Sequence, residues 1–226
     1  MRLVKMILGD VRFQFKYGFY FIYAVFSTLY VFLLLIFPET WREKAASIMI
    51  YSDPAAMGLL FMGAIVLLEK SQRVLNALAV SPVKVSEYIK AKAVSLVFIS
   101  VLVSLVLALM GGLKNIPVVL ITTALTSIIF TLLGLIVATK ISSLNQYIIA
   151  TVPLEIICFV PPIIYLFVPT AIMQWYPLNG SIALISNSSQ DPLYDIAVLL
   201  IVIVCLFIVA QRATAKMWRS LGGIKL

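Results

Sequence analysis

The sequence predicts an all-α membrane protein with six transmembrane helices. Of the 226 residues, 63% are hydrophobic and 12% are charged, which leaves too few polar residues to cover a soluble domain. The apolar residues gather into runs long enough to cross a bilayer core of about 30 Å as helices. None of these runs alternates apolar and polar residues as a barrel strand does. We therefore expect a single transmembrane permease domain over residues 1–226 and no sizeable soluble domain.

Six stretches qualify as membrane spans: residues 19–37, 48–68, 91–110, 117–138, 147–168 and 196–210. If the N-terminus is inside, all of the 17 basic residues except Arg42, Lys44 and Lys114 fall in inner segments. Because cytoplasmic loops are enriched in Lys and Arg, both termini are expected in the cytoplasm, with the chain in a prokaryotic plasma membrane. The net charge of +8 then reflects topology and contact with the lipid bilayer, and no nucleic-acid partner is expected.

Residues 1–18 predict a helix lying at the inner membrane interface, before the first two spans (residues 19–68). Its two expected faces are apolar (Val4, Ile7, Leu8, Val11, Phe15) and basic (Arg2, Lys5, Arg12, Lys16). Either it simply anchors the chain, or it is a lever that ties the first span to a cytoplasmic partner. A short outer loop is expected at residues 38–47, and Asp53 is expected near the outer end of the second span. Pro54 would be tolerated there only at a helix start or a kink.

Residues 69–92 form the longest polar interruption on the positively charged side. The pattern predicts a surface helix over residues 72–80, with one apolar face and one polar face. The apolar face holds Val74, Leu75 and Leu78, and the polar face holds Arg73 and Asn76. Ser81 and Pro82 end this helix, and Ser86 is the expected N-cap of the third span, with Glu87 in its first turn. The alternative is an ordinary solvated loop.

The fifth span, within residues 93–168, carries Pro153, Glu155, Pro161 and Pro162. A carboxylate within the bilayer is costly and normally faces protein or water. Glu155 could therefore bind a cationic or amphipathic substrate or make a gating hydrogen bond. It could equally be a protonated structural residue, bonded to the hydroxyl groups of the fourth span (Thr122, Thr126, Ser127, Thr131). The paired prolines are expected to break the helix and shape the outer pathway, although simple kinking explains them equally well.

The end of the chain is predicted to contain an outer re-entrant segment, a last span and a basic tail. Residues 169–194 are too long for a turn, and their portion 173–186 is semi-apolar with a Pro and a Gly, which favours short helices that dip into the membrane and return. Residues 195–211 form the sixth span, and residues 212–226 form a basic cytoplasmic tail.

The segment 69–92 resembles the connection between the second and third spans of ABC-2 type transporter permeases. The matching positions are Glu69, Arg73, Leu75, Leu78, Ser81, Pro82, Glu87 and Lys92. The six spans, the interfacial helix and the re-entrant segment agree with the same family. The resemblance implies that residues 72–80 are a coupling helix seated in a separate ABC ATP-binding subunit. The resemblance also implies a second permease chain, identical or different. Small permeases that export drugs are among the proteins that this chain resembles.

Several chemistries are excluded by residue content. There is no His, and Cys158 and Cys205 both lie in apolar runs, so neither a His-based triad nor a Cys/His metal site is available. No catalytic residue and no metal ligand are predicted. The sequence has no G-x-x-x-x-G-K-[ST] motif, so ATP and Mg would be bound by the partner subunit.

The expected function is therefore a permease that exports hydrophobic or amphipathic compounds, such as drugs, lipids or antimicrobial peptides, by alternating access. The alternative is a proton-coupled secondary transporter that uses Glu155. A single carboxylate and the lack of an inverted repeat disfavour this alternative. An intramembrane enzyme is disfavoured because no span has paired carboxylates or a metal-ligand set. The substrate and the direction of transport stay open.

Overall fold

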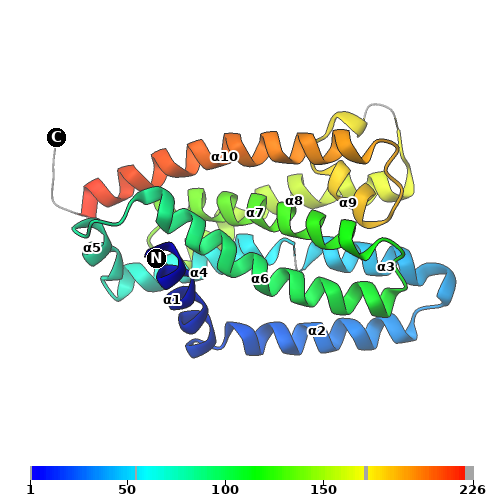
Figure 1. The fold of residues 1–226 in the computed structure, drawn as a ribbon, viewed down its shortest axis with the longest axis horizontal. Coiled ribbons are helices and arrows are strands. Elements are labelled where there is room, and N and C mark those ends of the chain that lie inside the picture. Colours follow the sequence, from blue (N-terminus) through cyan, green and yellow to red (C-terminus); the bar gives the residue numbers. More distant parts are fainter. Residues whose placement is uncertain (1, 54, 171–172, 222–226) are drawn as a thin grey trace.

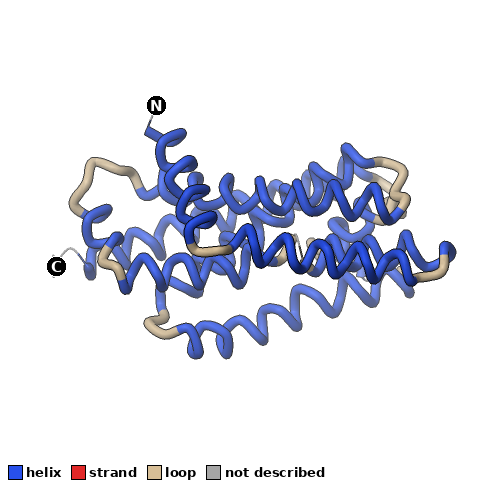
Figure 2. Tube along the Cα trace, turned by 90° about the horizontal axis from the view of Figure 1, so that it is seen from below, coloured by secondary structure: helices blue, strands red, loops and turns tan. Residues whose placement is uncertain are grey.

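The computed structural model describes residues 2–53, 55–170 and 173–221, and within these ranges the regular structure is entirely helical (Figures 1 and 2). The elements in chain order are α1 (Arg2–Lys16), α2 (Phe19–Ile36), α3 (Glu39–Ser52), α4 (Met57–Ser71), α5 (Val74–Ala79), α6 (Val85–Gly111), α7 (Ile116–Lys140), α8 (Leu144–Phe167), the 3-10 turn η1 (Met173–Trp175), α9 (Asn179–Ile185) and α10 (Pro192–Leu221). The all-α prediction is confirmed.

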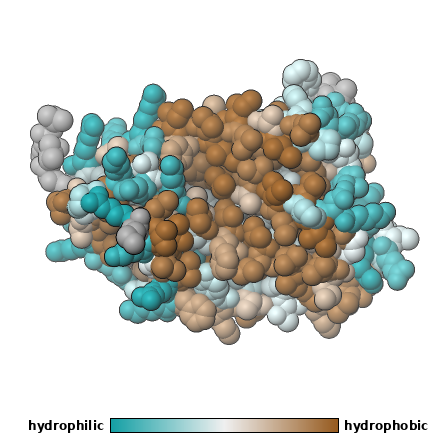
Figure 3. All heavy atoms as spheres, in the orientation of Figure 1, coloured by the Kyte–Doolittle hydropathy of each residue, from teal (hydrophilic) through white to brown (hydrophobic). Residues whose placement is uncertain are grey.

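Among the residues that the structure describes, six helical segments are long and apolar enough to cross a membrane. They are α2, α3 and α4 taken together as one 33-residue span, α6, α7, α8 and most of α10. These segments run along the long axis of the molecule (Figure 1). A hydrophobic band covers the middle of the face shown in Figure 3, and polar side chains gather at its two ends. The number of spans therefore agrees with the sequence prediction.

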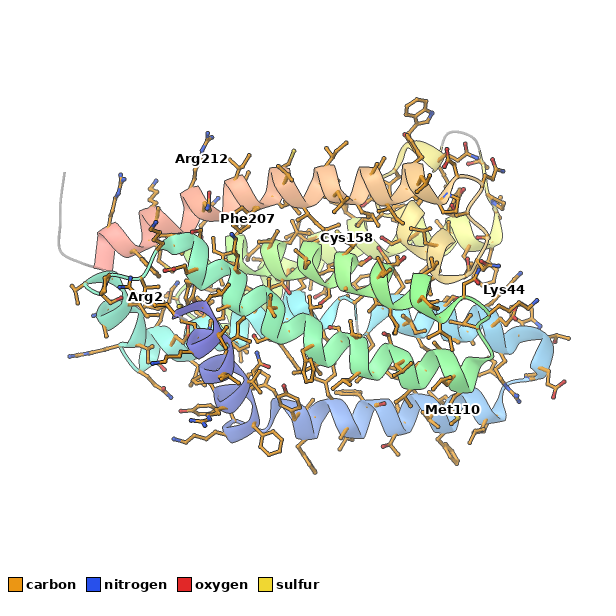
Figure 4. All side chains as sticks on the ribbon, viewed as in Figure 1. Arg2, Lys44, Met110, Cys158, Phe207 and Arg212 are labelled. Carbon is orange, nitrogen blue, oxygen red and sulfur yellow. The ribbon has the colours of Figure 1, made fainter. Side chains whose placement is uncertain are left out.

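One end of the bundle carries α1, α5 and the C-terminal turns of α10 (Figure 1), and we call it the α5 end. Arg2 and Arg212 lie there, whereas Lys44 lies at the opposite end (Figure 4). The expected basic tail is not a separate segment, because α10 continues as a helix to Leu221 and carries Lys216 and Arg219 along it. Lys225 lies outside the described residues.

The centre of the bundle is a close contact between α4 and α7, which also packs against α6 and α10. Gly58 and Gly63 on α4 and Gly134 on α7 allow this approach. A Cβ on Gly134 would lie 2.6 Å from the carbonyl oxygen of Leu59. Tyr147 of α8 fills the space beside Gly63, and its hydroxyl donates to the carbonyls of Leu59 and Gly134. The contact therefore leaves no room for a side chain at Gly134.

The second span begins further out than the sequence suggests. Helix α3 starts at Glu39, so the predicted outer loop at residues 38–47 is wrong. Pro38 immediately precedes the helix and Glu39 lies in its first turn, two features that favour a helix start. The chain leaves helical geometry at Asp53 and resumes it at Met57. Asp53 thus lies inside the span and not near its outer end, while Pro54 is outside the described residues.

Helix α8 runs without a break from Leu144 to Phe167, through Pro153, Pro161 and Pro162. The predicted helix break at the paired prolines is therefore wrong. A proline has no N–H group, so the carbonyl four residues earlier loses its intrahelical partner. In a membrane such a carbonyl needs a donor from another part of the protein.

Two tyrosine hydroxyls supply the donors that are missing at the paired prolines. Tyr176 donates to the carbonyl of Ile157 at 2.7 Å, and Tyr51 donates to the carbonyl of Cys158 at 2.7 Å. These are the two carbonyls that the paired prolines leave free. The prolines therefore serve as attachment points for α3 and for the segment before α9, and the helix stays continuous.

The segment between α8 and α10 contains η1 and α9, as the prediction of short helices requires. Every residue of α9 is buried, and this helix packs against α3, α7, α8 and α10. Its entry into the membrane stays a prediction.

Candidate coupling segment and intramembrane cavity

Helix α5 is a six-residue helix at the α5 end, between the long helices α4 and α6. Arg73 precedes it with a φ of 58°, a left-handed conformation that turns the chain sharply at the end of α4. The predicted helix over residues 72–80 is confirmed as a helix, with bounds Val74–Ala79. Its role in coupling stays a prediction.

The apolar residues of α5 are oriented differently from the prediction. Leu75 is fully buried in the same core cluster as Tyr88 and Trp218, and Leu78 is half-buried against that cluster. Leu75 thus attaches α5 to the chain's own bundle and offers no surface to a partner. The exposed surface of α5 and its flanks consists of Gln72, Arg73, Val74, Asn76, Ala77 and Val80.

The turn after α5 is held by side-chain hydrogen bonds. The Ser81 hydroxyl donates to the carbonyl of Leu78 at 2.7 Å and accepts from the backbone N–H of Val83 at 3.3 Å. The carbonyl of Pro82 accepts from the Arg2 guanidinium at 3.3 Å, which joins α1 to this turn. The segment is thus an ordered element, which argues against the alternative of an ordinary solvated loop.

Helix α6 begins at Val85, so Ser86 is not its N-cap. The Glu87 carboxylate instead accepts from the backbone N–H of Lys84 at 2.9 Å. This is the backward half of a capping box, and a carboxylate also interacts favourably with the positive end of the helix dipole. Glu87 therefore stabilises the helix start.

A buried ion cluster joins α1, α4 and α6 near the end of α4 that leads to α5. Lys92 Nζ lies 2.5 Å from Asp10 Oδ1 and 2.5 Å from Glu69 Oε1. The Tyr88 hydroxyl donates to Glu69 Oε2 at 2.7 Å. Lys92 is 1% exposed and Glu69 is 5% exposed, so these charges depend on each other for solvation. Burial raises the pKa of Asp10 above its usual 3.8, and the Lys92 ammonium partly opposes this shift.

The sequence analysis missed this cluster because it assigned only two faces to α1. A third face, formed by Met6, Asp10, Phe13 and Gln14, packs against the bundle. Gln14 is fully buried and donates to the Ser95 hydroxyl at 2.8 Å. Asp10 was the available signal, since it is the one acidic residue in a helix with four basic ones.

The two predicted faces of α1 are also present. The basic residues Arg2, Lys5, Arg12 and Lys16 are exposed. Three of the apolar residues, Val4, Leu8 and Phe15, are exposed as well, which suits a side turned to lipid.

Helix α1 also contacts the chain on both sides of α5. Its N-terminal Arg2 reaches the turn after α5, and Tyr17, just past its end, accepts a hydrogen bond from the Gln72 side chain. Lys70 adds a further connection, because its ammonium donates to the carbonyls of Ala138 and Ile141 at 2.7 and 2.6 Å and so caps the C-terminal end of α7.

A second feature is a partly open cavity of about 210 Å³, about half-way along the long helices. It lies between α2, the break that separates α3 from α4, and α8. Its lining includes Phe26, Asp53, Leu60, Glu155 and Phe159. The structure thus brings Glu155 to the same cavity as a carboxylate that the sequence analysis had placed at the outer end of a span. Pro153, Pro161 and Pro162 are not part of this lining.

None of the hydroxyl groups expected as partners of Glu155 bonds to it in the described part of the chain. The Thr126 hydroxyl donates to Ser181, and Ser127 pairs with Ser100. Thr122 and Thr131 are buried, and neither hydroxyl has a hydrogen-bond partner within the described part of the chain. Half-buried Glu155 makes no side-chain hydrogen bond or ion pair to any described residue, so the structural alternative is not realised.

Comparison with known proteins identifies the family. The model of the fluoroquinolones export permease protein family matches residues 1–218. The chain belongs to this family. Similar proteins include the fluoroquinolones export permease proteins of Mycobacterium tuberculosis strains CDC 1551 / Oshkosh and ATCC 25618 / H37Rv, each 36% identical over 86 residues. The aligned part is 38% of this chain and 36% of each relative's length.

In this member of the fluoroquinolones export permease family, α4 connects the two candidate sites. The Asp53 carbonyl accepts from the N–H of Met57 at 2.8 Å where α4 begins, and Glu69 lies in its last turn. Within the described residues, no group of three or more His, Cys, Asp or Glu side chains is arranged to hold a metal ion. The arrangement therefore places two carboxylates in the lining of one cavity and a buried polar cluster near the other end of α4.

Proposed function

We propose that this chain is the membrane-spanning permease of an ABC-2 type exporter, driven by a separate ATP-binding subunit in a prokaryotic plasma membrane. The observation that carries the proposal is α5, an ordered helix at one end of the bundle whose outer surface is exposed. A helix that only linked two spans would not need the hydrogen bonds that hold Ser81, Pro82 and Gln72 in place. Membership of an export permease family supports the same reading.

In this proposal the partner subunits bind ATP and Mg, and their closure pushes on α5. Arg73, Asn76, Ala77 and Val80 form the contact surface, and buried Leu75 passes the displacement into the bundle. A second permease chain, identical or different, completes the pathway, and the two chains alternate between inward-open and outward-open states. The proposal places both termini in the cytoplasm, on the side of the partner subunits, and the shared position of α1 and the end of α10 at the α5 end supports this (Figure 1).

The proposed substrates are amphipathic drugs, and fluoroquinolones are the first class to test, because the relatives are named for their export. The experiment is to coexpress the chain with a candidate ABC ATP-binding subunit from the same organism, purify the complex, and measure drug-stimulated ATP hydrolysis. Asn76→Arg and Val80→Arg place a charge on the exposed surface of α5. Asn145→Arg is the matched control, since Asn145 is an exposed residue at the start of α8.

The α5 variants are expected to lose the ATP-binding subunit on purification, whereas the Asn145 control keeps it. Full complex formation and stimulation by both α5 variants would contradict the proposed docking surface. Failure of the wild-type chain to bind any ATP-binding subunit would contradict the proposal itself.

A proton-coupled secondary transporter is the second candidate function. The observation that favours it is that Asp53 and Glu155 line one cavity, since two carboxylates in one cavity can carry protons more readily than a single one. The two functions separate in proteoliposomes that contain the chain alone. Drug uptake driven by an imposed pH gradient, without ATP, would favour the second candidate.

A further inference from the structure

The cavity lies deep within the membrane-spanning part of the chain. Asp53 follows the 14 residues of α3 and precedes the 15 residues of α4, so it lies about 20 Å from either end of the span. Glu155 is the twelfth residue of the 24-residue α8, which also places it near mid-helix. Both carboxyl groups are therefore held at the level of the hydrocarbon core.

The Asp53 side chain has no visible structural role. The residue is 5% exposed, and its Oδ2 atom has no hydrogen-bond partner in residues 2–53, 55–170 and 173–221. Its backbone closes α3 and starts α4, but no side chain caps the start of α4. An unpaired carboxyl at this depth costs about 2.5–3.5 kcal/mol on insertion scales. Such a group marks a place where a counter-charge is expected to bind.

The other walls of the cavity suit an organic cation. Phe26 and Phe159 contribute aromatic surface from α2 and α8, and aromatic faces attract ammonium groups. Glu155, on α8, adds a second carboxylate to the lining. The volume of about 210 Å³ is below the range of about 300–1,000 Å³ that encloses a whole drug-sized ligand. The cavity is therefore large enough for the amine-bearing ring of such a ligand and not for all of it.

We infer that this cavity binds the protonated amine of an amphipathic drug between Asp53 and Glu155, with the rest of the ligand lying along the exposed faces of α2 and α8. The inference rests on the proposed export function, because it names the part of the pathway that selects the substrate. Asp53 acts as the buried counter-charge, and Glu155 acts as the second charge at the half-exposed side. The class of ligand is a cationic amine joined to a flat apolar body.

Direct binding to the purified chain in lipid nanodiscs tests the inference without any ATP-binding subunit. The probes are ciprofloxacin, whose piperazine carries a positive charge, and N-acetylciprofloxacin, which has the same ring system but a neutral amide nitrogen. Their affinities are measured by equilibrium dialysis for the wild type, Asp53→Asn and Glu155→Gln. Matched controls are Asp191→Asn and Glu43→Gln, two exposed carboxylates outside the cavity.

Asp53→Asn and Glu155→Gln are each expected to weaken ciprofloxacin binding about tenfold or more, the usual effect of removing a hydrogen-bonded charge. Binding of the acetylated probe should stay within about twofold, and the controls should bind both probes as the wild type does. Unchanged ciprofloxacin binding by Asp53→Asn, or equal loss of both probes, would overturn the inference. If Asp53→Asn does not fold, Glu155→Gln decides by the same two criteria.

A wild-type chain that binds neither probe would overturn the inference and leave the docking of an ATP-binding subunit on α5 untouched. Conversely, charge-dependent binding by a chain that forms no complex with an ATP-binding subunit in the coexpression experiment would support the cavity and contradict the proposed energy source.

Discussion

Replacing Lys92 by Met tests whether the buried ion cluster holds the α5 end of the bundle together. The Lys92 ammonium lies 2.5 Å from a carboxylate oxygen of Asp10 and 2.5 Å from one of Glu69. Met preserves the apolar stem but removes the charge, so the two carboxylates lose their shared counter-ion. Removing one partner of a buried ion pair destabilises a protein by about 3–5 kcal/mol.

The lower end of that range applies here, because Asp10 has a way to relieve the unpaired charge. Burial already raises the pKa of Asp10, and the Lys92 ammonium is the main influence that opposes the rise. Without Lys92, Asp10 binds a proton more readily and the remaining repulsion falls. A loss of about 3 kcal/mol in a chain of this size lowers the midpoint of thermal unfolding by about 6–12 °C.

The assay is size-exclusion chromatography of detergent-solubilised protein after heating, with the folded peak followed by tryptophan fluorescence. Lys90→Met is the matched control, since Lys90 is exposed on the same helix, and its midpoint should stay within about 2 °C of the wild type. The double variant Asp10→Asn with Lys92→Met should recover part of the loss, because only Glu69 is then left unpaired. A midpoint for Lys92→Met as high as that of the control would refute the reasoning.

Three further outcomes are expected. Burial raises the pKa of Asp10 in the folded chain above 3.8, so the stabilising contribution of this residue is complete below pH 3.8 and declines as the pH rises through the folded-state pKa. Asp10→Asn should therefore make the midpoint of thermal unfolding depend less on pH between pH 4 and pH 7. Tyr51→Phe should cost about 1–3 kcal/mol by leaving a buried carbonyl unpaired. It should cost clearly less in a Pro162→Ala background, where the helix regains its own N–H donor, and equal losses in both backgrounds would contradict the role given to the tyrosine. Gly134→Ala should lower the midpoint of thermal unfolding, because the new Cβ would lie 2.6 Å from a backbone carbonyl oxygen. Gly9→Ala is the control and should leave the midpoint unchanged, since Gly9 has open space around it. Equal midpoints for the two variants would argue against the close α4–α7 contact.

The spans and α5 were predictable because they depend on local properties of the chain. A run of about 20 apolar residues has few alternatives to a membrane helix, and a proline after a short amphipathic stretch marks its end. The boundaries were less accurate for a physical reason. The charged residues at the start of α3 were taken as a loop, although a helix can extend beyond the hydrocarbon and carry charges in the aqueous layer.

The features that were missed depend on contacts between distant parts of the chain. Lys92 and Asp10 are 82 positions apart, so the pattern of α1 could suggest a third face but not its partner. The effect of the paired prolines also depends on distant contacts. The local rule predicts a broken helix, but it does not include the hydroxyl groups of Tyr51 and Tyr176, which come from other elements and satisfy the carbonyls that the prolines free.

A single helix, α4, connects the two proposed sites. Helix α4 begins four residues after Asp53, is about 22 Å long and carries Glu69 in its last turn. The break before Met57 separates α4 from α3, whereas the C-terminal end of α4 contacts α1 and α6 through the ion cluster. A push on α5 would therefore reach α4 at the end held by the ion cluster, and the helix would carry the movement to its other end, next to which Asp53 lines the cavity. If this is the coupling route, Lys92→Met should weaken drug stimulation of ATP hydrolysis without changing the affinity of the cavity for ciprofloxacin, and a parallel loss of both would show that the cluster acts only through stability.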